Sequence, residues 1–418
     1  CSTGPDDRAR TRVTRLPLPE PGRGGAEAFV DRHLGELASD DIAGSPRFRG
    51  GQRAADAALA SFEVAGYSRR RNEVHPPSRR GASQLSPYIR HGLLQLPEVW
   101  RAVAGGPSRD VAKFRNELLW QEYARHWYAR LGPRTAAGVR RSLVATADGG
   151  EGWNRELACL DLVLGELETD GWLVNQTRMW LASHWAVREG FAWRAGEDAF
   201  FQHLLDGSRA ANRLGWQWTT GVGSSKPYGF SRWQVEKRAP GLCDSCALKD
   251  RCPIQDWPDD PEFIAGERPH DLRGAAPPRR AGPSEAVRRG VPEAVWLTAE
   301  SLGESDPALA AHPDLPVVFV FDGPLLRTLG LASKRLVFLT ETLAELGAER
   351  PLEVFLGDPV HLLSDRALTV THAPVPGFDR RADALQPVEV HPWPWLARPG
   401  TGSVASFSAW RRSVQVAA

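Results

Sequence analysis

The chain has 418 residues, of which 42% are hydrophobic and 25% charged, and its formal net charge is +1 at pH 7. This length and composition fit two globular domains with their own cores and exclude an intrinsically disordered chain. No apolar run approaches the roughly 20 residues that span a bilayer, and the N-terminal residues lack a signal-peptide pattern, so we expect a cytoplasmic protein with no membrane partner. The near-zero net charge does not decide for or against nucleic-acid binding.

The first part of the chain has the periodicity of helices. Residues 1–25 are rich in Pro, Gly and Arg and are predicted to form an irregular leader. From residue 26 to 39, apolar residues recur at helical spacing. The same criterion predicts helices over 51–65, 86–104, 111–131, 153–169, 172–189, 196–205 and 208–214. The helical signal stops after Pro240, so we expect a helical domain over about 26–255.

The last part of the chain has a different pattern. Residues 256–290, rich in Pro, Gly and Arg, are predicted to be a linker. Short apolar or β-branched runs follow at 295–299, 317–321, 353–357, 367–371 and 387–391, with a predicted helix over 332–347. Strands that alternate with helices indicate a small parallel α/β sheet, which we place at 291–412.

Residues 171–218 contain six of the sixteen tryptophans, the only methionine (Met179), and the opposite charges Arg178 and Asp206. Tryptophans at this density usually form core. Polar groups remain among buried aromatic rings only where a partner satisfies them. The partner is either protein or a large planar polar ligand, and we interpret it as a flavin.

Five cysteines stand at positions 1, 159, 243, 246 and 252, an odd and sparse number that argues against a disulfide framework. Cys243, Cys246 and Cys252 form a C-x2-C-x5-C-P run, whose spacing resembles iron–sulfur ligation. Cys159, on a predicted helix, is the internal candidate for a fourth ligand. A structural zinc site and unligated thiols are the alternatives.

Several segments resemble the FAD-binding domain of the photolyase/cryptochrome family. They are GWLVNQTRM, FAWRAGEDAFFQHLLDG, AANRLGWQW and PYGF, preceded by GASQLSPYIRHG and FRNELLWQEYARH. The resemblance is strong over 50–240 and weaker over 290–412. It implies an all-helical photolyase-type FAD-binding domain followed by a small parallel-sheet, Rossmann-like α/β domain of the antenna type. In the family the antenna domain usually comes first, so the domain order is identified as circularly permuted, which exposed and neighbouring termini permit. The antenna pigment is left open.

The resemblance also implies which residues bind FAD. These are Tyr67, Ser83, Leu85, Ser86, Glu117, Gln121, Trp172, Asn175, Arg178, Asp206, Ser208 and Asn212. Residues 83–86 precede a predicted helix and therefore offer a pyrophosphate cradle, although a plain helix cap is the alternative. Arg178 and Asp206 match the ion pair beside the isoalloxazine ring, and Asn212 matches the position that faces flavin N5.

Further positions match the substrate cavity of photolyases that repair cyclobutane pyrimidine dimers. They are Glu117, Trp120, Asn175, Met179 and Trp218, which would stack on a flipped-out dimer and hydrogen-bond its base edges. Enzymes for the (6-4) lesion have histidines at the positions of Asn175 and Met179, so the resemblance disfavours that lesion. Trp216 and Trp193 match the inner two members of the photoreduction chain, with a role as plain core as the alternative.

The cysteines are similar to the set in the iron–sulfur bacterial branch of the family, which implies a 4Fe-4S cluster on Cys159, Cys243, Cys246 and Cys252. The leading hypothesis is a monomeric, FAD-dependent, light-driven photolyase of damaged DNA. Two arginines of the dimer photolyases are Gln121 and Gln176 here. This difference favours two alternatives: a cryptochrome-like blue-light photoreceptor without repair, or a flavoenzyme for a small molecule.

Overall fold

The computed structural model describes residues 14–146, 152–266, 269–274 and 278–416, and its contacts divide the chain into two compact units. Unit 1 combines residues 1–61, 85–99 and 279–398, and unit 2 combines 62–84, 100–278 and 399–418. Both units are discontinuous in sequence, whereas the sequence analysis divides the chain into consecutive domains. Most of the predicted leader, residues 1–13, lies outside the described residues.

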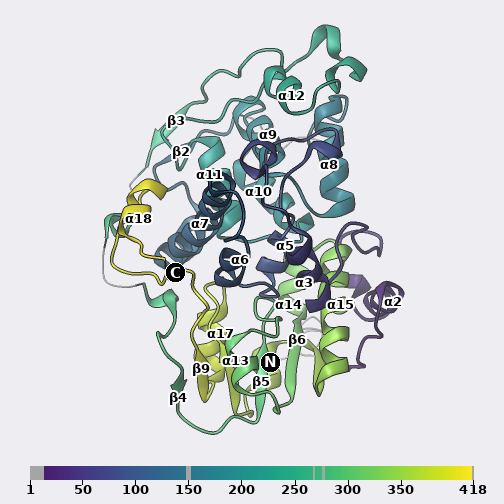
Figure 1. Cartoon of the computed structure of the whole chain (residues 1–418), viewed down its shortest axis with the longest axis vertical. Coiled ribbons are helices and arrows are strands. Elements are labelled where there is room, and N and C mark those ends of the chain that lie inside the picture. Colours follow the sequence, from purple (N-terminus) through teal and green to yellow (C-terminus); the bar gives the residue numbers. More distant parts are fainter. Residues whose placement is uncertain (1–13, 147–151, 267–268, 275–277, 417–418) are drawn as a thin grey trace, which may run out of the picture. The chain divides into compact units, whose positions relative to one another are not determined.

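Unit 1 is built around a seven-stranded sheet with the order β1-β7-β6-β5-β8-β9-β4. Figure 1 labels β4, β5, β6 and β9 of this sheet. The five central strands are parallel and the two edge strands, β1 and β4, are antiparallel. The strand order reverses at β5, as in doubly wound α/β folds. The bounds are β1 Thr14–Leu16, β4 Val287–Arg288, β5 Ala294–Leu297, β6 Val317–Asp322, β7 Leu352–Gly357, β8 Leu368–Thr371 and β9 Glu389–His391.

Both faces of this sheet are covered, because five consecutive residues of β6 are buried and successive side chains point to opposite faces. On one face, Trp296 of β5 stacks on Phe378 of α17 (Phe378–Leu385), with ring centroids 6.0 Å apart. On the other face, Phe321 of β6 contacts Phe29 of α2 (Arg23–Leu34). The remaining helices of the sheet segment are α13 Pro307–Ala311, α14 Gly323–Leu329, α15 Ser333–Glu349 and α16 Pro359–Leu363.

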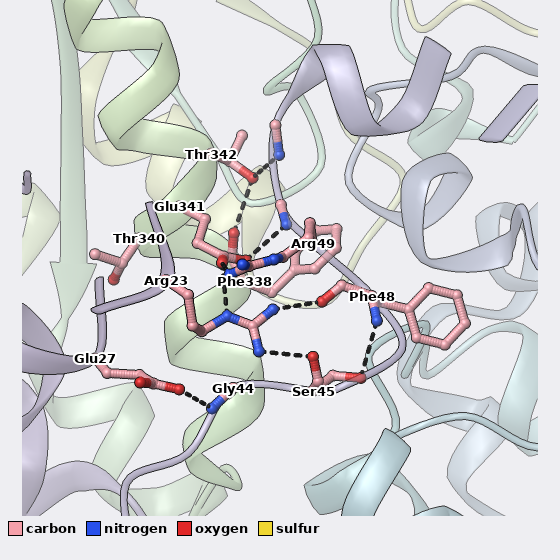
Figure 2. Close-up of polar contacts among 12 residues, drawn as sticks. Arg23, Glu27, Gly44, Ser45, Phe48, Arg49, Phe338, Thr340, Glu341 and Thr342 are labelled. Atoms are coloured by element: carbon pink, nitrogen blue, oxygen red, sulfur yellow. Dashed lines mark hydrogen bonds and ion pairs between the residues drawn. The ribbon is translucent and has the colours of Figure 1, made fainter. Parts of the chain in front are cut away.

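A buried carboxylate ties the N-terminal segment to α15 (Figure 2). Glu341 accepts hydrogen bonds from Arg23 Nε at 2.7 Å, from Arg49 Nη1 at 2.8 Å and from the backbone N–H of Gly50 at 2.8 Å. A Cβ at Gly50 would lie 2.1 Å from the carbonyl oxygen of Phe338, so only glycine permits this approach. The network explains why residues before 61 belong to the α/β unit although their own pattern is only helical.

Unit 2 is helical, and its longest helix is α7 (Ser108–Leu131). The others are α4 Tyr67–Arg70, α8 Ala158–Asp170, α9 Asn175–Ser183, α10 Trp193–His203, α11 Ala211–Thr220, α12 Arg232–Arg238 and α18 Phe407–Ser413. A π-helical turn, His184–Arg188, extends α9. The fold-class prediction is confirmed, since a helical part precedes a parallel-sheet α/β part along the chain.

One predicted helix is wrong in extent. The segment 86–104 contains two short helices, α5 (Ser86–Arg90) and α6 (Leu96–Ala102), separated around Gly92, whose φ is +71°. This left-handed conformation ends a helix and favours glycine. Several other helices match their predictions within a few residues, among them α3 (Gln52–Ser61), α7, α10 and α15.

The core of unit 2 contains four indoles from three neighbouring helical segments, Trp180, Trp185, Trp193 and Trp216, together with aliphatic residues of α8. Beside it, β2 (Arg141–Leu143) pairs with β3 (Phe263–Ala265) in a two-stranded antiparallel sheet. Because β3 lies within the predicted linker, part of that linker is ordered in unit 2. Among the described helices, none combines the length and apolar character needed to cross a membrane.

Candidate functional site

A bidentate ion pair lies between α9 and the turn that precedes α11. Arg178 Nη1 and Nη2 donate to Asp206 Oδ1 and Oδ2 at 3.1 and 2.7 Å, and Arg178 Nε donates to the carbonyl of Leu173 at 3.1 Å. The backbone N–H of Leu205 donates to the carbonyl of Gly171 at 2.8 Å, which holds the two segments together. Asp206 is buried and Arg178 is partly exposed. Parallel bonds of this kind fix the orientation of both groups.

Asn212 lies in the first turn of α11, where its backbone N–H donates to the carbonyl of Ser208 at 2.9 Å. Its side chain is 7% exposed, and the amide Nδ2 has no hydrogen-bond partner among the described residues. An unpaired buried N–H costs about 1–3 kcal/mol. A ligand that presents an acceptor to this amide would remove the cost, so the residues present fit a flavin, whose ring edge carries such acceptors.

The two indoles predicted to carry electrons are both buried in the core of unit 2. Trp216 of α11 packs against α10 so closely that a Cβ at Gly196 would lie 2.2 Å from its ring. Its ring centroid lies 5.1 Å from that of Phe200. Trp193 begins α10, with the guanidinium of Arg194 over its ring. Trp172, predicted to contact FAD, is buried just before α9.

The residues predicted to face a lesion are among the more exposed members of the candidate site. Asn175, the first residue of α9, is exposed, Met179 is half-buried, and Trp218 is 44% exposed. Glu117 of α7 is half-buried and is ion-paired with Lys113 Nζ at 2.6 Å and Arg71 Nε at 3.4 Å. These two ion pairs of Glu117 are not predicted from the sequence.

Trp120 is covered on one face by a residue that the sequence analysis missed. Its ring stacks on that of Phe407 in α18, with centroids 3.9 Å apart and planes inclined by 8°. Tyr123 Oη donates to the carbonyl of Val404 at 2.8 Å, and Trp410 Nε1 donates to His126 Nδ1 at 2.8 Å. The segment around α18 is therefore held against α7, and one stacking face of Trp120 is occupied by the chain itself.

The predicted phosphate-binding segment divides between the two units, with Ser83 in unit 2 and Leu85 and Ser86 in unit 1. Gln84 between them has a φ of +58°, a left-handed turn before α5. Tyr67, also predicted to contact FAD, is buried edge-on against Phe114, with ring centroids 5.0 Å apart. Burial raises the pKa of the Tyr67 hydroxyl well above its ordinary value, with a smaller contribution from Glu117.

The glutamines and Ser208 form contacts of their own. Gln176 is buried and its Nε2 donates to Tyr228 Oη at 2.7 Å. Gln121 is half-buried on α7. Ser208 Oγ accepts from the backbone N–H groups of Ala210 at 3.3 Å and Ala211 at 3.4 Å, at the turn that leads into α11.

Four cysteines of unit 2 line one narrow cavity. Cys159 comes from α8, and Cys243, Cys246 and Cys252 come from the turns after α12. Burial, and then the neighbouring Cys243, Cys252 and Cys246, raises the pKa of Cys159 to about 12. The cavity also has cationic side chains, Arg232 and Lys249. The raised pKa keeps Cys159 protonated in the metal-free protein, and binding of a metal would be needed to deprotonate it.

The spacing of the sulfur atoms bears on which metal fits. A zinc ion with four thiolates at about 2.3 Å would hold every pair of sulfurs at about 3.8 Å. Within the described structure, however, no three of these sulfurs lie within 4.8 Å of one another. A polynuclear cluster binds each thiolate to a different metal ion and so requires wider spacing. The four sulfurs are therefore not gathered as closely as four thiolates on a single zinc ion would be.

Residues 114–238, which contain most of α7 and both members of the Arg178–Asp206 pair, match the family model for the FAD binding domain of DNA photolyase. This part of the chain is similar to the FAD-binding domain of the photolyase/cryptochrome family. Two similar proteins are the deoxyribodipyrimidine photo-lyases of Synechococcus sp., 31% identical over 41% of this chain and 39% of that protein, and of Thermus thermophilus, 33% identical over 51% of each. Cryptochrome DASH of Idiomarina loihiensis is 30% identical over 50% of this chain and 49% of that protein.

The match to the photolyase FAD-binding domain covers the ion pair, Asn212, both buried indoles and the exposed Trp218. Cys159 also falls inside it, whereas the other three cysteines of the cavity lie beyond its end. The chain spans about half or less of the length of these relatives. The family-model match is therefore to the FAD-binding domain alone.

Proposed function

We propose that this chain binds FAD and splits cyclobutane pyrimidine dimers in DNA by light-driven electron transfer. The observation that carries the proposal is the buried, unpaired amide of Asn212 within the segment that also holds the Arg178–Asp206 pair. A buried ion pair rarely gives net stability, and an unpaired buried amide costs stability. A bound flavin would explain why the chain keeps both the ion pair and the unpaired amide, because each would contact its polar ring.

In this mechanism the reduced flavin supplies the electron when bound. The Asn212 side chain would hold the edge of the ring, because its amide can donate through Nδ2 or accept through its oxygen as the protonation of that edge changes. The Arg178–Asp206 pair fixes α9 against the turn before α11 and would help to orient the ring. Buried Trp172 excludes water from the same segment. Trp216 and Trp193 are the proposed internal route for electrons that reduce the flavin.

The lesion would meet the exposed residues of the same helices. Trp218 has an exposed indole face for stacking, and base–aromatic stacking contributes about 1–3 kcal/mol per base. Asn175 has both donors and an acceptor for base edges, and Met179 supplies a polarisable contact. Glu117 is an acceptor whose two cationic neighbours keep it in place. Trp120 takes part only through the face that Phe407 leaves uncovered.

We further propose a 4Fe-4S cluster on Cys159, Cys243, Cys246 and Cys252. The support is their shared cavity, the spacing of their sulfurs and the two cationic side chains that offset thiolate charge. The cluster would join α8 to the turns after α12, so its proposed role is structural. An independent check is iron and acid-labile sulfide in purified protein.

A second candidate is a cryptochrome-like photoreceptor that binds FAD without repairing DNA. Two observations favour it: Gln176 is engaged with Tyr228 rather than presenting a cation, and Phe407 occupies a face of Trp120. A flavoenzyme for a small molecule shares this support, since the face of Trp120 that Phe407 covers is closed to a stacked DNA base.

The deciding experiment illuminates the reduced, FAD-loaded protein anaerobically with single-stranded DNA that contains a thymine dimer. The proposal predicts light-dependent release of thymines, lost in Trp218→Ala and retained in Trp233→Ala, whose indole is also exposed (54%, against 44% for Trp218) but lies on α12. FAD content should be equal in both variants. If FAD is bound and reduced but no thymine is restored, repair is ruled out and the photoreceptor or small-molecule function remains.

A further inference from the structure

Three metal-ligand side chains meet in unit 1, in the part of the chain that the FAD-binding match does not cover. Glu389 and His391 are the first and last residues of β9, and their i, i+2 spacing places both on one face of the sheet. His312 directly follows α13, which packs on β8 and β9. One ligand atom of each residue lies within 4.8 Å of the others, and among the described His, Cys, Asp and Glu residues this is the group of three that does so.

Glu389 lies within hydrogen-bonding distance of His312 and of His391, but only its contact with His312 has the geometry of a hydrogen bond. His312 Nε2 and Glu389 Oε2 form a hydrogen bond of 2.7 Å. His391 Nε2 lies 3.2 Å from Glu389 Oε1, yet neither atom has an aligned hydrogen-bond partner among the described residues. Glu389 is 1% exposed and His391 is 5% exposed. Buried polar atoms are nearly always paired, so two that are close in distance but misaligned indicate a further partner.

Arg288 is the cationic side chain that lies next to the unpaired oxygen of Glu389. It stands opposite Glu389 in the β4–β9 pair, and its Nε lies 2.7 Å from Glu389 Oε1. The Arg288 side chain is 65% exposed, so little packing holds it there. An ion pair with one exposed partner is weak. Arg288 can therefore leave the carboxylate for solvent at small cost, whereas the buried Glu389 and His391 cannot.

We propose that His312, Glu389 and His391 bind one divalent transition-metal ion of the zinc class, with Arg288 as the cation that holds Glu389 in the metal-free protein. Two imidazoles and a carboxylate are a usual three-residue set for zinc, and the fourth tetrahedral position is left for water or a further ligand. The half-buried His312 gives the ion access from solvent. The ion would join the sheet edge at β9 to the end of α13 and stabilise unit 1.

The test is titration of the chelator-treated full chain with Co²⁺ and Zn²⁺. Co²⁺ bound by nitrogen and oxygen ligands gives visible d–d absorption, whereas Co²⁺ on the cysteines of unit 2 adds a thiolate charge-transfer band, so the two sites are told apart. The proposal predicts one Co²⁺ per chain without the thiolate band, displaced by Zn²⁺. His391→Ala should weaken binding by at least about 100-fold, more than loss of an outer-shell partner does. The matched control is His361→Ala, an exposed histidine of α16 in the same unit, with unchanged binding.

Because His391→Ala removes a buried side chain, a second variant keeps the test decisive. Arg288→Gln removes the competing cation from an exposed position, so the proposal predicts several-fold tighter Zn²⁺ binding and a larger rise of the melting temperature on adding Zn²⁺. If the trio is only a hydrogen-bonded network, Arg288→Gln lowers the melting temperature and Zn²⁺ does not restore it. Either that result, or a Co²⁺ spectrum identical in His391→Ala, would overturn the proposal.

Discussion

The Arg178–Asp206 pair gives the sharpest test of why unit 2 keeps a charged pair among its indoles. Asp206→Asn leaves the Arg178 guanidinium without its two carboxylate contacts of 3.1 and 2.7 Å. Loss of one partner from a fully buried pair costs about 3–5 kcal/mol. Arg178 is 22% exposed, so water screens part of this loss and we expect about 2–3 kcal/mol.

The assay is a double-mutant cycle of Asp206→Asn, Arg178→Gln and the double variant, each unfolded with urea in the absence and presence of FAD. The cycle isolates the coupling between the two side chains. The matched control is Arg155→Gln with Asp161→Asn, an exposed pair of the same unit at 3.0 Å, which should couple by no more than about 1 kcal/mol. FAD that binds the folded chain should raise the free energy of unfolding of the wild type. The increase should be much smaller in a variant that lacks either Arg178 or Asp206.

Two results would refute this reasoning. A coupling energy no larger than that of the exposed control pair would mean that burial adds nothing to the interaction. Equal stabilisation by FAD in the wild type and in Asp206→Asn would mean that the pair does not position the cofactor, whatever its contribution to folding.

The remaining predictions concern other parts of the chain. Burial raises the pKa of Asp306 to about 7, so between roughly pH 4 and 7 the folded chain holds a proton that the unfolded chain releases, and stability falls as the pH rises through this window. Asp306→Asn keeps the oxygen that accepts from Thr371, Ala308 and Leu309, so melting temperatures measured across that window should become flatter. Cys159→Ser should abolish bound iron and sulfide, whereas Cys1→Ser should leave both unchanged, and equal iron in both would refute the ligand set. Phe407→Ala should uncover the second face of Trp120 and tighten binding of dimer-containing single-stranded DNA several-fold at unchanged FAD content, as measured by fluorescence anisotropy; unchanged affinity would show that this face is not used.

Elements with a strong local pattern were predictable from the sequence. The long helix α7 and the strand β6 lie within three residues of their predicted bounds, because α7 has enough residues to establish a helical period and β6 is a continuous apolar run. The helix predicted over 86–104 failed because Gly92 adopts a left-handed conformation that its apolar neighbours do not signal. The short β1 and β4 were missed because two or three residues set no period.

Contacts between distant parts of the chain had no local signal. The attachment of the N-terminal helix α2 to the sheet depends on Phe29 meeting Phe321 and on Arg23 meeting Glu341. The candidate cofactor residues were found through resemblance and not through spacing. The stacking of Phe407 on Trp120 joins residues on opposite sides of the whole α/β segment, so neither sequence neighbourhood indicates it.

We propose that residues 171–212 hold a flavin whose ring edge contacts Asn212. The most direct measurement is the amount of FAD released per chain on denaturation of purified, FAD-reconstituted protein, for the wild type and for Asn212→Ala. We predict about one FAD per wild-type chain, and weaker binding with altered flavin absorption in Asn212→Ala. A wild-type chain that folds but takes up no FAD would contradict the account.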